Sequence, residues 1–407
     1  MLSVMAKLQR APSSKLGIRC NQGGWNQLHP ILILANSGRA LAQSAAASGY
    51  RVVVADNYGD RETRQAALAW IRIFSGANVG HWRQKIVRFI EAEKYPVGLI
   101  FGSGFENRPD IMEELSRRGI LLGNTPHCVR LLKDPRRFFP LLGKLTIPAP
   151  EVQLQLPDNP LGWLCKAIGG AGGHHIFPAT IPNIRRQQLW VRQGWTTAAP
   201  VPYYYQRKLE GQPGSVLFLA NGKEVQILGY HYLWLAPTPA MPYRYGGIAA
   251  PLNLTPSAGA LLRNYLQAIV TATGLRGLNG LDFIHGSQGI QVLEINPRPP
   301  ASLDLYQDRF SPFDAHVKAC LGSSLPIQIA PIAVARAFSI LYSPHPWRIP
   351  PNIVWPAFCT DLPAENTLIK REEPLCSIHA MATSTETCQQ LIRRRQNQVL
   401  EWLTSSF

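Results

Sequence analysis

The sequence predicts a mixed α/β and α+β protein, in which a Rossmann-like domain precedes a larger α+β region. Three observations predict this class. Near the amino terminus, short apolar runs alternate with helical segments, an order typical of a doubly wound sheet. Farther along, apolar runs follow one another, and two of them flank a short turn as in a β-hairpin. The length of 407 residues allows two or three such units.

The first predicted domain opens with a β-α-β unit. Residues 31–35 and 51–55 are expected to form buried strands, and the small-residue segment 40–48 between them a helix. A helix over 79–93 and a strand over 97–101 continue the alternation. The first turn lacks the Gly-x-Gly-x-x-Gly pattern, so the sequence does not support a dinucleotide site.

Polar residues follow the strands of this first domain. Ligands of open α/β sheets bind beyond the carboxyl ends of strands, so these side chains could line a substrate crevice. Ordinary turn chemistry is the alternative interpretation for each of them. The residues are Ser37, Arg39, Asp56, Ser103 and Glu106.

A glycine-rich segment lies in the second predicted domain. Helical sequence over 125–143 breaks near Asp134, and a strand over 161–168 carries Lys166 directly before the glycines of 169–173. Backbone N–H groups of such a turn can approach phosphate oxygens, and the lysine can meet the same phosphates as a point charge. His174 and His175 follow, but no third ligand lies at metal spacing, so we do not expect a metal there.

The strongest motif is a hairpin whose two strands meet around the turn 286–289. Side chains alternate along a strand, so Glu294 and Asn296 share one face, and Asp282 on the partner strand can reach it. Two carboxylates and an amide oxygen suit Mg²⁺, which prefers such ligands together with substrate phosphates. Arg298 follows closely, and its planar guanidinium suits a phosphate or a carboxylate. A surface hairpin is the alternative.

Composition limits the possible partners. The formal net charge is +16, but the basic residues are spread along the chain, so we expect no specific nucleic-acid site. Seven cysteines without a Cys-x-x-Cys indicate reduced thiols and a cytoplasmic protein. No apolar run is long enough to span a bilayer, so we expect no membrane association.

The expected organisation has four parts. Residues 1–30 contain several basic residues and no acid, and they are expected to form a disordered extension, with a transit peptide as the alternative. In the last part, strands are expected near 334–342 and 376–380 and a helix over 386–403. The parts are a basic extension (1–30), a Rossmann-like domain (31–125), a second domain (126–330) and a small C-terminal α+β segment (331–407).

This order of elements resembles the ATP-grasp superfamily, and within it the group described as predicted ATP-dependent carboligases related to biotin carboxylase. Segments 104–109, 123–124, 133–135 and 148–150 are similar to that group's pattern. The resemblance implies that ATP is held between the two subdomains of an ATP-grasp fold (126–330), behind a Rossmann-like pre-ATP-grasp domain.

The resemblance also implies roles for individual residues. Lys166 corresponds to a lysine on the α- and β-phosphates, and Arg298 to an arginine near the γ-phosphate and the acceptor. The other roles are a phosphate-covering loop (Gly169, Gly170, Gly172, Gly173), an adenine hinge (Gln206, Arg207, Lys208, Leu209) and metal ligands (Asp282, Glu294, Asn296). The metal would be Mg²⁺, as two ions, and Mn²⁺ could replace it.

Two positions depart from the family's pattern. The ATP-contacting lysine that relatives carry after an aspartate is replaced here by Pro135. The sequence leaves open whether Lys133, Arg136 or no residue takes over the role of that lysine. Gly214 stands where a ribose-binding acid is common, which leaves Glu210 as the substitute.

The implied activity is that of a carboxylate–amine ligase, which consumes ATP and passes through an acylphosphate. The partners would be a small-molecule carboxylate and an amine, and a homodimer is one possible assembly. Some relatives suggest glutamate ligation in the synthesis of methanopterin- or methanofuran-type cofactors. The alternatives are a bicarbonate-activating carboxylase and a nucleotide-binding regulatory protein without turnover.

Overall fold

The computed structural model describes residues 29–73, 79–182, 185–186, 202–325 and 332–405. The expected basic extension over 1–30 therefore lies almost wholly outside the described residues. Within the described part, no helix has the length and apolar character needed to cross a membrane. The sheets described below confirm the predicted α/β and α+β class.

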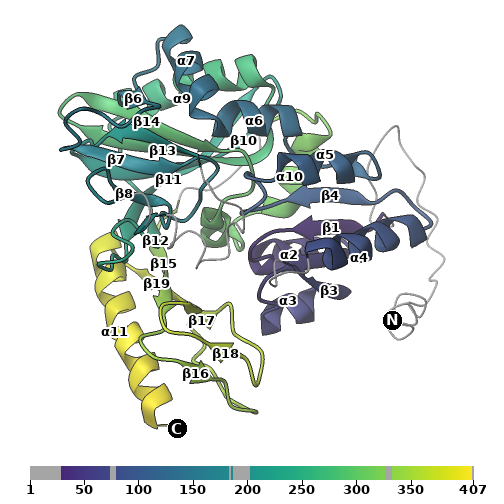
Figure 1. The fold of residues 1–407 in the computed structure, drawn as a ribbon. Coiled ribbons are helices and arrows are strands. Elements are labelled where there is room, and N and C mark those ends of the chain that lie inside the picture. The colour runs from purple at the N-terminus through teal and green to yellow at the C-terminus, as the bar shows by residue number, and fades with distance from the viewer. Residues whose placement is uncertain (1–28, 74–78, 183–184, 187–201, 326–331, 406–407) are drawn as a thin grey trace.

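The amino-terminal sheet is parallel, with strand order β3-β2-β1-β4-β5 (Figure 1). Its central strand consists only of buried apolar residues because both faces are covered. Ile31 and Ile33 pack toward α2 and α10, whereas Leu32 and Leu34 pack toward α4 and α5. The elements are β1 (Ile31–Leu34), α2 (Arg39–Ala47), β2 (Val52–Asp56), α3 (Arg61–Ala66), β3 (Ala69–Arg72), α4 (Val79–Ala92), β4 (Gly98–Phe101), α5 (Pro109–Ser116) and β5 (Ile120–Leu121).

Two short helices connect this sheet to the rest of the protein. They are α6 (Pro126–Lys133) and α7 (Pro135–Lys144), and the expected break at Asp134 is confirmed. The Thr125 side chain accepts the N–H of Cys128 and caps α6, and the Asp134 side chain accepts the N–H of Arg136 and caps α7. Both helices begin with a proline, which needs no hydrogen bond at that position.

A large antiparallel sheet forms the centre of the molecule, with strand order β14-β13-β10-β11-β12-β15-β19-β17. Its strands come from two parts of the sequence, since β12 pairs with β15 through Gly247 and Ser339. Its elements are β10 (Gln212–Asn221), β11 (Val225–Leu235), β12 (Tyr245–Ala250), α9 (Pro256–Thr273), β13 (Arg276–Gly286), β14 (Gly289–Asn296), β15 (Ala335–Tyr342), β17 (Cys359–Thr360) and β19 (Pro374–Ala382).

A smaller sheet with order β6-β9-β7-β8 faces the large one across the pocket described below. Its strands are β6 (Val152–Gln153), β7 (Trp163–Ala167), β8 (Ile176–Pro178) and β9 (Tyr203–Arg207). The remaining elements are η1 (Ala301–Tyr306), α10 (Pro312–Cys320), β16 (Trp347–Arg348), β18 (Leu368–Ile369) and α11 (Thr385–Ser405). In Figure 1, α11 runs along the carboxyl-terminal strands of the large sheet.

Candidate active site

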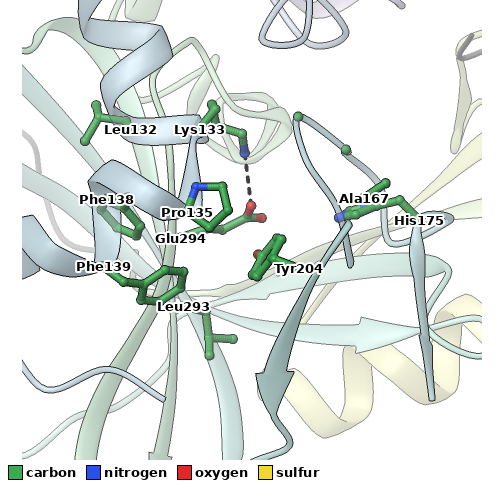
Figure 2. A pocket seen from close by; sticks show the side chains of 12 residues that line it. Leu132, Lys133, Pro135, Phe138, Phe139, Ala167, His175, Tyr204, Leu293 and Glu294 are labelled. Atoms are coloured by element: carbon green, nitrogen blue, oxygen red, sulfur yellow. Dashed lines mark hydrogen bonds and ion pairs between the residues drawn. The ribbon is translucent and has the colours of Figure 1, made fainter. Parts of the chain in front are cut away.

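A pocket with about 330 Å³ of space free of protein atoms lies between α6, α7, the small sheet and strand β14. Figure 2 shows Lys133 and Glu294 as a pair, with Phe138 and Phe139 on one side of Glu294 and Tyr204 on the other. The lining residues are Leu132, Lys133, Pro135, Phe138, Phe139, Ala167, Gly169, Gly170, His175, Tyr204, Leu293 and Glu294.

The hairpin of β13 and β14 brings together the three residues predicted to bind Mg²⁺. Asp282 lies opposite Glu294, and Gly280 lies opposite Asn296. The Asn296 amide donates a hydrogen bond to Asp282 over 3.0 Å. Ile295, between the two predicted ligands, is fully buried on the other face. The alternation argument from sequence therefore places all three side chains together, as expected.

The two carboxylates of this hairpin have opposite electrostatic surroundings. Burial would raise the pKa of Glu294, but the positive charges of Lys133 and Lys166 outweigh it and lower that pKa to about 2. For Asp282, burial and the facing Glu294 charge both raise the pKa, to about 7. The facing carboxylates thus disfavour full ionisation of Asp282, and a divalent cation would relieve this repulsion.

The donor set fits Mg²⁺. Two carboxylates and one amide oxygen are hard ligands, and the open side of the group faces the pocket through Glu294. The described residues contain no group of three or more His, Cys, Asp or Glu side chains placed to hold a metal.

Lys133 takes the position that the sequence left open. Its Nζ lies 3.0 Å from Oε2 of Glu294, and its side chain is only 7% exposed. Arg136, the other candidate, points to solvent and pairs with Asp134 over 2.8 Å. The basic residue at the pocket is therefore Lys133, although it precedes Asp134 and relatives place their lysine after the aspartate.

Lys166 is buried at the base of the small sheet. Its Nζ donates a hydrogen bond to Oε1 of Gln206 over 2.8 Å. Burial lowers the pKa of Lys166, the nearby Lys133 acts in the same direction, and Glu294 and Asp282 oppose them. The Nε2 of Gln206 is buried and has no hydrogen-bond partner within the described residues. An unsatisfied buried donor is costly, and a bound ligand would satisfy it.

The glycine-rich segment connects β7 to β8 and needs its glycines. Gly169, Gly172 and Gly173 all have positive φ angles, of 77°, 69° and 74°. A Cβ at Gly170 would overlap the His175 imidazole, and one at Gly173 would overlap the Tyr243 carbonyl oxygen. Gly169 and Gly170 line the pocket, whereas Gly172 and Gly173 contact the chain before β12.

The predicted hinge runs from Gln206 through Leu209 at the end of β9. The N–H of Arg207 donates to Glu151 and the N–H of Lys208 donates to Gly162. The N–H of Leu209 makes no hydrogen bond within the described part of the chain. Arg207 directs its guanidinium over Trp163, at 4.9 Å, on the outer side of the hinge.

Other candidate residues have different surroundings. Glu210 is exposed. Arg298 is paired with Glu106, the buried acid after β4, and does not line the pocket of Figure 2. Glu106 also accepts the N–H of Gly104 over 2.6 Å. The positive charge of Arg298 overcomes the effect of burial and lowers the pKa of Glu106. Arg298 instead lines a smaller hollow beside Asn124.

Two polar residues of the first domain serve the fold. Arg39 is buried and binds Asp304 through two nitrogens, at 2.9 and 2.6 Å, and Asp361 at 2.8 and 3.1 Å. Asp56 accepts the N–H groups of Gly38 and Gly59 at 2.9 and 2.8 Å, besides the indole of Trp70. These contacts favour the structural alternative for both residues. For Ser37 no side-chain contact is recorded, and the backbone oxygen of Ser103 accepts the N–H of Asn36.

The class of the protein follows from this geometry and a family match. Residues 134–302, somewhat less than half of the chain, match the family model of the ATP-grasp domain. It includes the glycine-rich segment, the hinge and the hairpin with its carboxylates. The resemblance drawn from the sequence is thereby confirmed.

One curated relative matches a short part of the chain. A formate-dependent phosphoribosylglycinamide formyltransferase from Corynebacterium glutamicum (strain R) is 32% identical over 94 residues, which are 23% of this chain and 22% of that protein. The match thus spans about a fifth of that relative's length.

Solved structures share the fold over most of both chains. An N5-carboxyaminoimidazole synthetase from Staphylococcus aureus, complexed with ADP, superposes with a TM-score of 0.66 at 16% identity, covering 91% of this chain and 99% of that one. The biotin carboxylase domain of a Hydrogenobacter thermophilus 2-oxoglutarate carboxylase, with MgADP, ADP and bicarbonate, gives a TM-score of 0.69 at 14% identity, covering 90% and 88%. At these identities the likeness shows the fold.

Sequence reasoning missed the apolar wall of the pocket. Phe138 and Phe139 lie on α7, and Tyr204 lies on β9 with its ring centroid 6.2 Å from that of Phe139. The adjacent phenylalanines are visible in the sequence, but nothing local indicates that they face a strand more than sixty residues away.

Proposed function

We propose that the protein is an ATP- and Mg²⁺-dependent carboxylate–amine ligase that works through an acylphosphate. The observation that carries the proposal is the arrangement of two lysines and two carboxylates around one pocket. Lys133 and Glu294 line that pocket, and Asp282 is close enough to Lys166 to act on the pKa of that lysine. The class of the domain supports the same interpretation.

The nucleotide would occupy the pocket between the two sheets. The free N–H of Leu209 and the unsatisfied Nε2 of Gln206 are donors suited to a purine base. Phe139 and Tyr204 supply an apolar wall for its ring. Lys166 and Lys133 would bind the phosphates under the segment from Gly169 to Gly173, and exposed Glu210 would reach the ribose.

The metal ligands in this proposal are Asp282, Glu294 and Asn296, and they would hold two Mg²⁺ ions. The ions would supply charge neutralisation for the phosphates, and Mn²⁺ could replace them. The raised pKa of Asp282 and its contact with Asn296 support a site that gains from a bound cation. Positioning and charge neutralisation account for most of the catalysis in phosphoryl transfer.

The reaction has two balanced steps. A carboxylate oxygen of the first substrate attacks the γ-phosphorus, the bond to the β,γ-bridging oxygen breaks, and ADP leaves. The amine nitrogen of the second substrate then attacks the acyl carbon, loses a proton, and phosphate leaves. We assign to Arg298 the orientation of the carboxylate, a role for which its planar guanidinium is suited. The glycine-rich segment would exclude water from the acylphosphate.

The carboxylate substrate can be proposed more specifically than the class of enzyme. Formate and bicarbonate are named with the relative and the solved structure described above, and both are small anions whose oxygen atoms could attack a phosphoryl group. Glutamate, ligated during the synthesis of a methanopterin- or methanofuran-type cofactor, is our more specific proposal. The three molecules define the panel with which the reaction is best tested.

Positional isotope exchange tests the first step without knowledge of the amine. ATP labelled at the β,γ-bridging oxygen is incubated with the protein, Mg²⁺ and one carboxylate, and scrambling of the label is followed by NMR. We expect scrambling with at least one carboxylate of the panel and none without it, and none with the Glu294→Gln variant. Exchange supported by bicarbonate alone would replace this proposal with the carboxylase. ATP binding without exchange or ADP release for any carboxylate would favour the regulatory alternative.

A further inference from the structure

Arg244 is a buried cation that the proposed ATP site does not use. It lies directly before β12, next to the glycine-rich segment. The N–H of Tyr245 donates to the Gly172 carbonyl over 3.0 Å. A Cβ at Gly173 would lie 3.4 Å from the Cα of Arg244. The backbone of Arg244 is therefore fixed against the segment that is proposed to cover the phosphates.

The guanidinium of Arg244 is incompletely satisfied. The residue is only 6% exposed. Its Nε donates to the Ala236 carbonyl over 2.9 Å, and its Cζ lies 3.7 Å from the centre of the Tyr342 ring. Its Nη1 is buried without a hydrogen-bond partner. Within the described residues, no carboxylate forms an ion pair with Arg244.

The neighbouring groups do not neutralise this charge. Burial lowers the pKa of Arg244, and Tyr342 and Glu372 oppose that effect without forming an ion pair with it. His174, on the glycine-rich side, has its pKa lowered to about 4 by burial and by the Arg244 charge, so it is neutral at pH 7. A buried charge without a counter-ion is costly, which is tolerated at sites where a ligand supplies the opposite charge.

Arg244 is also close to the end of the proposed catalytic hairpin. Tyr245, the next residue, is near enough to Asp282 and Arg298 for their charges to act on its hydroxyl, and burial raises the pKa of that hydroxyl. The Tyr245 carbonyl accepts the hydroxyl of Tyr342, the ring on which Arg244 stacks. A fixed cation thus lies between the glycine-rich segment, the hairpin and the C-terminal strands.

We infer that Arg244 binds an anionic group, a carboxylate or a phosphate, of the substrate that reacts with ATP. A guanidinium with free terminal nitrogens can bind either group with two hydrogen bonds. The inference rests on the proposed ligase function and names the charge of its substrate. The phosphates of ATP are the other possible source of such an anion, and the experiment separates the two.

Calorimetric titration provides the test. The protein is first saturated with MgADP, and inorganic phosphate, bicarbonate and L-glutamate are then titrated as separate probes. The proteins are the wild type, Arg244→Gln, Arg244→Lys and the control Arg393→Gln, which removes the same charge from an exposed position of α11. Melting temperatures establish that each variant is folded.

We expect at least one probe to bind the wild type, and Arg244→Gln to weaken it by roughly tenfold or more, the scale for loss of a charged hydrogen-bonding partner. Arg244→Lys should recover part of the affinity, and Arg393→Gln all of it. MgADP affinity should stay within about twofold in every protein.

Three results would overturn the inference: equal probe affinity in wild type and Arg244→Gln, no binding of any probe, or a parallel loss of MgADP affinity, which would assign Arg244 to the nucleotide. If the wild type binds no MgADP, the ligase proposal itself fails.

Discussion

The Nζ of Lys133 and the Oε2 of Glu294 lie 3.0 Å apart, which joins the last residue of α6 to strand β14. Lys133 is thereby held at the mouth of the hairpin that carries Asp282 and Asn296. The same contact lowers the pKa of Glu294 and keeps this carboxylate charged at any physiological pH. Charge at both partners is what binding of a metal-bound triphosphate requires.

Replacing Glu294 should remove most of the activity. We expect Glu294→Gln to lower ATP turnover by about 10²-fold or more, the scale for loss of one electrostatic stabiliser. The measurement is ADP release at saturating Mg²⁺ with the carboxylate identified by isotope exchange. Glu224→Gln, at an exposed turn, is the matched control. Wild-type turnover of the Glu294 variant would remove this residue from the proposed site.

Lys133 should bind the phosphates of the nucleotide while it holds Glu294 in place. Lys133→Met deletes a positive charge beside the proposed phosphates, so we expect MgATP to bind about tenfold more weakly. Titration calorimetry measures this, with Lys144→Met as the control at an exposed end of α7. Unchanged affinity would mean that Lys133 only supports the hairpin.

Glu106 should act on Arg298 without contacting the nucleotide. We expect Glu106→Gln to lower carboxylate-dependent ADP release by about tenfold, because a misplaced positioning residue costs rate, while MgADP affinity stays unchanged. Glu91→Gln, at an exposed position of α4, serves as the control. A loss confined to nucleotide affinity would contradict a positioning role.

Gly173 should not tolerate a side chain. Alanine there would adopt a left-handed conformation and overlap the Tyr243 carbonyl oxygen, so the glycine-rich segment would have to leave its place. We expect Gly173→Ala to lower turnover by about tenfold or more. Gly143→Ala, in a helix with open space around it, should behave as the wild type. Denaturant unfolding separates a loss of stability from a loss of rate.

Buried histidines should make the fold sensitive to acid. His316 accepts the N–H of Leu278 and donates to the Leu122 carbonyl, and burial lowers its pKa to about 4. The unfolded chain binds this proton near pH 6.5, so the neutral histidine contributes fully above that pH. The contribution is lost at ~1.4 kcal/mol per pH unit as the pH falls toward 4. Urea unfolding between pH 7 and 4 measures it, and a His316→Gln variant with the same slope as the wild type would contradict it.

Local patterns predicted the parts of the site that lie on one element or on two strands joined by a short turn. The register of Asp282, Glu294 and Asn296 follows from alternation along two adjacent strands, and the break at Asp134 follows from the proline after it. Lys133 could not be assigned, because its partner is 161 positions away and its place in the family pattern is occupied by Pro135.

Strand β12 and helix α10 are among the elements that escaped prediction, for a related reason. Strand β12 reads Tyr-Gly-Gly-Ile-Ala-Ala, and its glycines and alanines have little strand propensity. A Cβ at Gly247 would overlap the Trp234 ring and the Phe338 carbonyl oxygen, so the strand depends on close approach of its neighbours. Helix α10 was missed as well, and its Phe313 and Val317 complete the core of the amino-terminal sheet. Tertiary packing decides both.

Arg39 has a mechanical consequence. Arg39 is the first residue of α2, and its buried guanidinium pairs with Asp304 after the hairpin and with Asp361 near β17. These three parts therefore cannot separate without leaving buried charges unpaired. The small sheet of β6 to β9 shares no strand with either of the other main sheets. If the protein opens and closes around a nucleotide, we therefore expect the small sheet to move relative to the other two sheets, and the peptide at Leu209 to act as the hinge.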